Sequence, residues 1–143
     1  MALSITDPDI SDLSWAVRMS AALGQATESA YNALTADDPT LTAAQMVNGV
    51  VKVSGQTTAQ GVTTPTATLL LAALPDAKVG TSFDFVLQNA NSSSGEATIV
   101  AGEGVTLVGT TIVPITKTQL YKGIVTAVST PAVSLIGLLT APV

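Results

Sequence analysis

The hydrophobic positions of the chain follow two different spacings, and the change between them falls near residue 40. Over residues 13–36 the apolar residues recur three or four positions apart, without a proline and with one glycine, which predicts a helix. Ser11 or Asp12 is suited to cap its first turn, and Pro39 ends it because proline cannot continue the hydrogen-bond ladder. The predicted apolar positions are Leu13, Ala16, Leu23, Ala30 and Leu34 on one stripe, with Trp15, Met19, Ala22 and Ala26 on a neighbouring face.

Beyond residue 48 short Val- and Thr-rich runs are separated by glycine, proline and asparagine, which predicts strands joined by turns. Phe83 and Phe85 alternate with polar residues as in a half-buried strand, so we expect Asp84 to face solvent. A helical turn over residues 42–47 should end in a left-handed cap at Asn48, and a short helix over 64–74 should be capped by Thr64 or Thr66. The predicted strands span residues 50–53, 82–89, 97–101, 105–108, 110–114, 119–128 and 132–139.

This pattern predicts a mainly β fold, an antiparallel β-sandwich or squat barrel with one short inserted helix, preceded by a long N-terminal helix or arm. The charge follows the same division. The chain of 143 residues has 5 basic and 10 acidic side chains, a net charge of −5. The first 40 residues hold six acidic residues and one arginine and so carry the whole excess. We therefore expect an arm over residues 1–40 and a β-rich knob domain over residues 41–143.

Composition then restricts the chemistry. Without cysteine or histidine the chain has no thiolate nucleophile, no Ser-His-Asp relay, no ordinary zinc site and no disulfide. The acidic run from Asp7 to Asp12 begins like a calcium loop, but Asp12 stands where glycine is required and Arg18 where a glutamate is required. Gly102-Glu103-Gly104 lacks the third glycine and the helix of a phosphate-binding loop. We expect no enzyme activity, no cofactor and no metal, and the acidic balance indicates no nucleic-acid partner.

The high apolar content does not form a membrane span, because no run of about 18 apolar residues occurs. The first 13 residues have no basic stretch and contain three aspartates, so we also expect no signal peptide. A low charge then suggests a surface covered by other subunits. The candidate functional residues are partner contacts on the predicted helix, where a single tryptophan could anchor an interface or join a core. These contact residues are Leu13, Trp15, Ala16, Met19, Leu23 and Leu34.

Residues 41–138 contain turn-forming and helix-capping segments in a characteristic order. The most specific segments are Thr64-Pro65-Thr66-Ala67 and Val79-Gly80-Thr81-Ser82-Phe83, followed by Gly102-Glu103-Gly104-Val105 and Gly109-Thr110. Over this range the chain resembles small structural proteins of tailed phages, namely head decoration (cement) proteins and virion fibre or knob domains. The N-terminal helical part lies outside the resemblance.

The resemblance implies a capsid decoration protein that stabilises the head by bridging neighbouring copies of the major capsid protein. It implies a homotrimer on the outer capsid surface, with the N-terminal helix binding the capsid or packing within the trimer. The alternative is a receptor-binding fibre tip, in which loops such as 56–63 and 89–95 would recognise carbohydrate. Copy number in virions separates the two, since a cement protein is abundant and a fibre is not.

Overall fold

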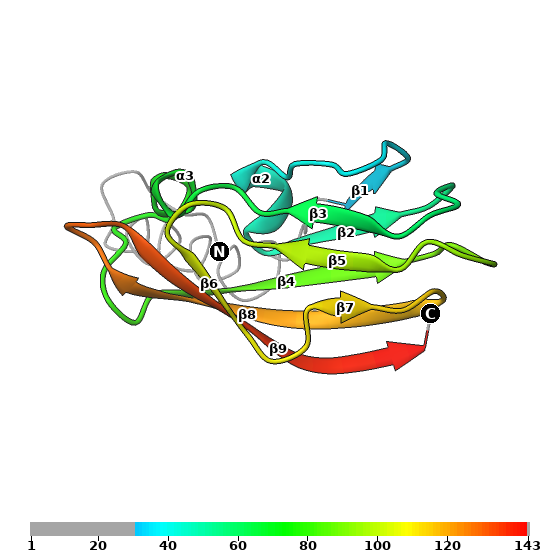
Figure 1. Cartoon of the computed structure of the whole chain (residues 1–143). Helices are drawn as coiled ribbons and strands as arrows, with labels where there is room; N and C mark the ends of the chain where they lie inside the picture. Colours follow the sequence, from blue (N-terminus) through cyan, green and yellow to red (C-terminus); the bar gives the residue numbers. More distant parts are fainter. Residues whose placement is uncertain (1–30, 143) are drawn as a thin grey trace, which may run out of the picture.

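A computed structural model describes residues 31–142 of the chain as two β-sheets packed face to face (Figure 1). The prediction of a β-sandwich is therefore confirmed. The helix predicted over residues 13–36 lies outside the described residues up to position 30. The strands are β1 (Tyr31–Leu34), β2 (Gly49–Val53), β3 (Gln60–Thr63), β4 (Ser82–Asn89), β5 (Ala97–Val100), β6 (Val105–Val108), β7 (Ile112–Val113), β8 (Lys117–Ala127) and β9 (Ala132–Pro142), and the helices are α2 (Ala43–Met46) and α3 (Ala67–Ala72).

The larger sheet has the strand order β1-β2-β4-β8-β9-β6, and the smaller sheet has the order β3-β5-β7. Both sheets are mixed, so the antiparallel pairing that was predicted holds for three of the seven strand pairs. The pairs β4–β8, β8–β9 and β5–β7 are antiparallel, whereas β1–β2, β2–β4, β3–β5 and β6–β9 are parallel. The chain changes sheet after each strand from β2 to β7, so these strands are not joined by hairpins within one sheet, and the parallel strands β1 and β2 are connected through α2.

The core lies between the sheets and is built from alternate residues of the strands. Phe83, Phe85 and Leu87 on β4 are buried, while Ser82 and Asp84 are exposed, as the alternation predicted. The rings of Phe85 and Tyr121 stack with their centroids 5.8 Å apart. Because aromatic pairs and branched aliphatic residues bury much apolar area, these inward faces stabilise the sandwich without any disulfide.

Both short helices are present, with the predicted left-handed residue at Asn48 and the predicted cap at Thr66. The Thr42 hydroxyl accepts a hydrogen bond from the Gln45 backbone, and the Gln45 side chain accepts one from the Thr42 backbone, which forms a capping box. Asn48 follows this turn with φ of 53°, in the left-handed conformation expected there. The Thr66 hydroxyl caps α3, and Leu70 of α3 is fully buried in the core.

Two strands differ from the sequence prediction. Residues 31–34 form β1 instead of the end of a helix, because they pair in parallel with β2 and Leu34 packs against the core. Tertiary pairing here overrides local helix propensity. Residues 60–63 form β3 instead of a loop, with Gln60 and Val62 buried. Because Gln60 is polar but buried, the alternation of buried and exposed positions in this strand cannot be recognised from the polarity of its residues. Residues 31–34 are therefore part of the larger sheet, although they precede the predicted domain boundary at residue 41.

Candidate interaction surfaces

Most of the predicted partner-contact residues cannot be placed, since Leu13, Trp15, Ala16, Met19 and Leu23 lie outside the described residues. Leu34 is placed in β1. Its side chain is half-buried and packs against the core beside Val53, its register partner in β2. In this structure Leu34 therefore contributes to the fold of the sandwich.

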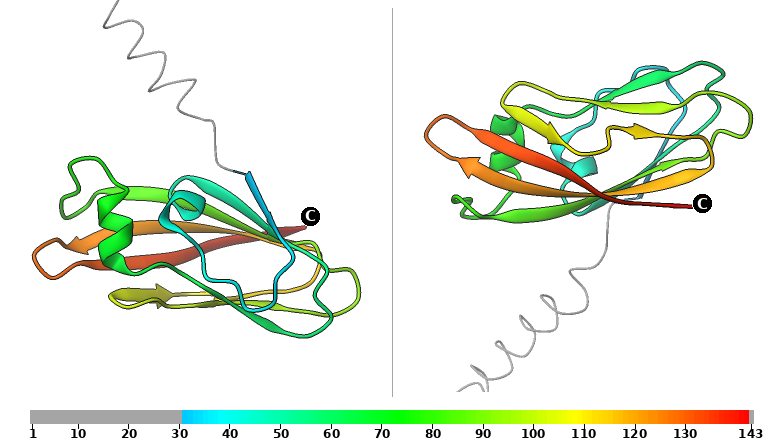
Figure 2. Two further views of the ribbon diagram at one scale, coloured as in Figure 1. Left: turned by 90° about the horizontal axis from the view of Figure 1, so that it is seen from above. Right: turned by 60° about the horizontal axis from the view of Figure 1, so that its bottom comes forward.

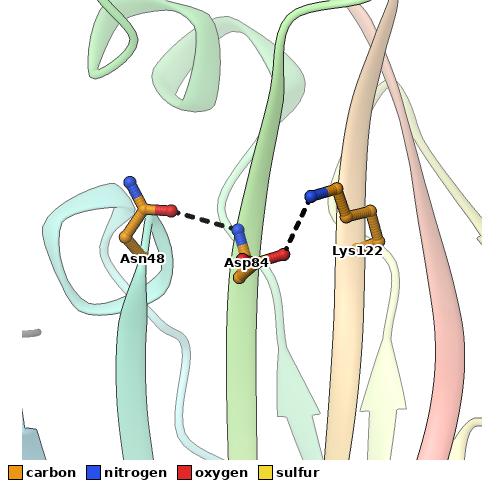
Figure 3. Close-up of polar contacts among 3 residues, drawn as sticks. All are labelled: Asn48, Asp84 and Lys122. Carbon is orange, nitrogen blue, oxygen red and sulfur yellow. Dashed lines mark hydrogen bonds and ion pairs between the residues drawn. The ribbon is translucent and has the colours of Figure 1, made fainter. Parts of the chain in front are cut away.

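Two acidic residues of the described part of the chain, Asp38 and Asp84, make defined polar contacts. Asp38 has φ of 45°, and its Oδ1 atom accepts a hydrogen bond of 2.7 Å from the Gly61 backbone. Asp84 is exposed on the outer face of the larger sheet, as predicted, and its Oδ1 atom lies 3.1 Å from Lys122 Nζ. The Asp84 backbone donates to Asn48 Oδ1 at 3.1 Å (Figure 3). Within residues 31–142 no group of three or more Asp or Glu side chains is arranged to hold a metal ion.

The Gly102–Gly104 segment is a packed turn between β5 and β6. The Thr64 hydroxyl accepts a hydrogen bond from the Gly102 backbone, and the Glu103 carbonyl accepts one from Ala67 at the start of α3. A Cβ atom at Gly102 would come within 2.5 Å of the Thr64 carbonyl oxygen. The backbone of this turn thus hydrogen-bonds to α3 and to the segment before α3. Its position agrees with a turn between the strands predicted over residues 97–101 and 105–108.

One end of the sandwich exposes large apolar side chains. Leu69 on α3, Val79 in the loop before β4 and Val128 in the turn after β8 are 55%, 64% and 44% exposed. Figure 1 and both views of Figure 2 place α3, this loop and the β8–β9 turn at the same end of the molecule. We call Leu69, Val79 and Val128 the apolar end.

The apolar end is held in place by backbone hydrogen bonds. Gly80 donates to the Val125 carbonyl at 2.9 Å, which ties the loop before β4 to β8. Ala67 at the start of α3 donates to the Glu103 carbonyl at 2.8 Å, and Ala127 pairs with Ala132 at the base of the β8–β9 turn. Exposed apolar side chains on a fixed backbone lose little conformational entropy on binding, so this end is suited to contact another protein surface.

The opposite end of the sandwich is built around buried amides, and we call it the amide end. Asn89 donates through Nδ2 to the carbonyls of Gly95 and Val113, both at 2.9 Å, and accepts a bond from the Asn91 backbone. Asn91 donates to the same Gly95 carbonyl and accepts from the Gln56 backbone at 3.0 Å. Gln56 donates to the Ala36 carbonyl. These contacts join β4 to β7 and connect three loops.

The amide end contains the loops that the fibre alternative assigned to carbohydrate. The hydrogen-bonding groups of Asn89 and Asn91 are directed into the protein, and both side chains are at most 3% exposed. Gln60 is 4% exposed, and neither atom of its amide has a partner among residues 31–142. Ser92 and Ser93 are the exposed side chains of the 89–95 loop. The asparagines therefore serve the fold of this end.

Sequence reasoning did not single out the residues of the apolar end, although one signal was present. Leu69, Leu70 and Leu71 are consecutive, and a helix with 3.6 residues per turn cannot bury three consecutive side chains against one core. In α3 the buried member is Leu70, and Leu69 faces outward. Val79 and Val128 lie in turns, where exposure depends on the tertiary path of the chain.

Among the described residues no helix has the length and apolar character needed to cross a membrane.

Comparisons of this chain with protein-family models, with curated protein sequences and with solved structures find no match.

Proposed function

We propose that this chain is a non-enzymatic structural protein of a tailed-phage virion that decorates and stabilises the capsid by bridging neighbouring capsid subunits. The observation that carries the proposal is the apolar end, where three large aliphatic side chains stand exposed on a backbone fixed by hydrogen bonds. A monomeric soluble protein seldom exposes several large apolar residues in one region. In a protein–protein interface, the apolar residues buried at its centre contribute most of the binding free energy. The resemblance of residues 41–138 to cement proteins supplies the class of partner.

In this proposal the apolar end contacts the major capsid protein, and the chain acts as a homotrimer on the outer capsid surface. A low charge supports this arrangement, because charged residues are depleted at the centre of protein interfaces. The chain has 10% charged residues, compared with about 25% in an average globular domain. Capsid stabilisation then depends on the area of the interface and on its shape complementarity to the capsid, and it requires no reactive group.

The test is a binding assay with phage heads that lack this protein. The purified chain should bind in many copies per particle and raise the temperature at which the heads lose DNA. The double variant Leu69→Asp, Val79→Asp should bind about tenfold or more weakly, since it places charges at the centre of the proposed contact. Ser93→Asp, at the amide end, is the matched control and should bind as the unmodified chain does.

Three results would contradict the proposal: no binding to heads, only a few copies per particle, or equal binding by the double variant. Light scattering after size exclusion tests the trimer separately, and a stable monomer at micromolar concentration would contradict that part alone. Glycan binding by a low-copy protein would instead favour the fibre alternative.

A further inference from the structure

The outer face of the larger sheet carries a continuous apolar row. In the register of the strands Tyr31 pairs with Val50, Val50 with Val86, and Val86 with Leu120. These four residues alternate along β1, β2, β4 and β8 with side chains that point into the core, so they share the outer face. Tyr31 is 62% exposed, and the other three are half-buried. We call Tyr31, Val50, Val86 and Leu120 the outer row.

Polar and charged residues border the outer row on both sides. The neighbouring register positions hold Asp84 and Lys122 on one side, joined by the ion pair seen in Figure 3. Lys52 and Gln88 pair on the other side. A solvent-facing side of a sheet normally presents polar residues, so an apolar row across four strands between charged borders indicates a covering element. Since Asp84 and Lys122 are paired, the net charge of +1 on this border comes from Lys52.

The segment that precedes β1 has the properties of that element. Residues 1–30 join the structure at Tyr31, which is itself the first member of the outer row. Their sequence predicts an amphipathic helix whose apolar side chains include Leu13, Trp15, Met19 and Leu23. Asp7, Asp9, Asp12 and Glu28 against Arg18 give these 30 residues a net charge of −3. That sign is opposite to the charge of Lys52, which borders the row.

The dimensions also agree. A row across four strands spans three inter-strand distances, about 14 Å. A helix over residues 13–27 would be about 22 Å long, and the three residues that remain before Tyr31 fall within the usual length of about 2–6 residues for a helix-to-strand connection. The helix is therefore long enough to cover the row, and the connection is long enough to bring it back over the sheet.

We propose that the N-terminal segment of the chain packs as a helix on the outer row of its own sandwich, with Trp15 buried against it. The inference goes beyond the proposed function, because it concerns the packing of the free protein and holds for any partner of the apolar end. The outer face would then be an internal interface of each subunit, and the apolar end would remain available to other subunits.

The single tryptophan makes the first test direct. In the full-length chain the fluorescence of Trp15 should be that of a buried indole and should not change on serial dilution. Val86→Glu, in the outer row, should shift the emission to longer wavelength and increase quenching by iodide. Ser82→Glu, on the outer face of the same strand but outside the row, is the matched control and should leave both unchanged. An unshifted emission in a folded Val86→Glu protein would overturn the proposal.

A second test does not place a charged residue in the outer row. The chain has no cysteine, so the pair Met19→Cys and Leu120→Cys introduces the only two thiols, and eight residues of helix between Met19 and residue 27 span about 12 Å, close to the length of the row. Oxidation should form a disulfide within one chain, whereas Met19→Cys paired with Ser92→Cys, at the amide end, should form none. A disulfide that joins two chains, detected by mixing the two single variants, would overturn the proposal by placing the segment on a second copy. The absence of any disulfide between residues 19 and 120 would overturn it as well.

Discussion

The two ends of the sandwich invert the usual distribution of polar and apolar residues. At the amide end the side chains of Asn89 and Asn91 are buried and bind backbone carbonyls of the loops. At the apolar end Leu69 and Val79 stand in solvent, although the core lies a few residues away in sequence. Polar residues therefore hold one end together, and apolar residues of the other end are free to contact a partner.

This difference shows why residue type alone is a poor guide to role in this protein. A buried amide contributes to stability only through its hydrogen bonds, because desolvation of an unpaired amide is unfavourable. An exposed leucine contributes little to the folded state, because its environment hardly changes on unfolding. The asparagine-rich loop is thus a structural element, and the aliphatic loop and helix form the candidate contact surface.

The largest effect on stability is expected at the amide end. Asn89→Ala removes two donors to backbone carbonyls and one acceptor, all in a site that is 0% exposed. We expect the free energy of unfolding to fall by about 3 kcal/mol, because two buried carbonyls lose this partner. Urea denaturation of the full chain measures the change.

Gln60→Met is the matched control for Asn89→Ala. It removes an equally buried amide whose atoms have no partner within residues 31–142, so it should change the free energy of unfolding by less than about 1 kcal/mol. Equal losses for the two variants would show that burial of the side chain, and not its hydrogen bonds, holds this end together.

A smaller effect is expected at Tyr121, between the two ends. Its hydroxyl is buried without a partner among residues 31–142, and burial raises the pKa of this hydroxyl above its ordinary value of 10.0. The unfolded chain therefore loses this proton at a lower pH than the folded chain. The resulting stability is fully present below about pH 10 and falls by about 1.4 kcal/mol per pH unit above it, until the hydroxyl of the folded chain also ionises.

Tyr121→Phe removes both the loss of stability above pH 10 and the unpaired buried hydroxyl. We expect the variant to be more stable than the unmodified chain by about 1 kcal/mol at pH 8, and the difference to grow above pH 10. Denaturation series at pH 8 and pH 11 measure both quantities. A variant that is less stable at pH 8 would indicate that the hydroxyl has a partner in solution.

The smallest effect on stability is expected at the apolar end. Leu69→Ser and Val79→Ser should each change the free energy of unfolding by less than about 0.5 kcal/mol, because both side chains are more than half exposed. Leu70→Ser, one position along α3 and 0% exposed, should lose several times as much. A large loss for Leu69→Ser would contradict its assignment to a contact surface.

Much of the sandwich was predictable because its signals are local. The strand over residues 82–89 has the predicted bounds, since Phe83 and Phe85 alternate with polar residues within one short run. The caps at Asn48 and Thr66 were also predictable, because a left-handed asparagine, or a hydroxyl that accepts a backbone hydrogen bond, acts within a few residues. The exposure of Asp84 follows from the same alternation.

What could not be predicted depends on residues far apart in sequence. Tyr31–Leu34 forms a strand only because β2, some twenty residues later, offers a parallel partner. Gln60–Thr63 is a strand because β5 pairs with it, although its buried glutamine resembles a loop residue. The outer row is invisible in sequence, since its members belong to four strands and only the register aligns them.

The sequence by itself determined the β-rich class of this protein, the division between an acidic N-terminal segment and a nearly uncharged remainder, and the positions of most turns. These properties are set by composition and by periodicity within a strand or a helical turn. Only the tertiary structure decided which apolar residues are exposed and which polar residues are buried. The burial of a side chain depends on the elements that pack over it, and those elements come from distant parts of the chain.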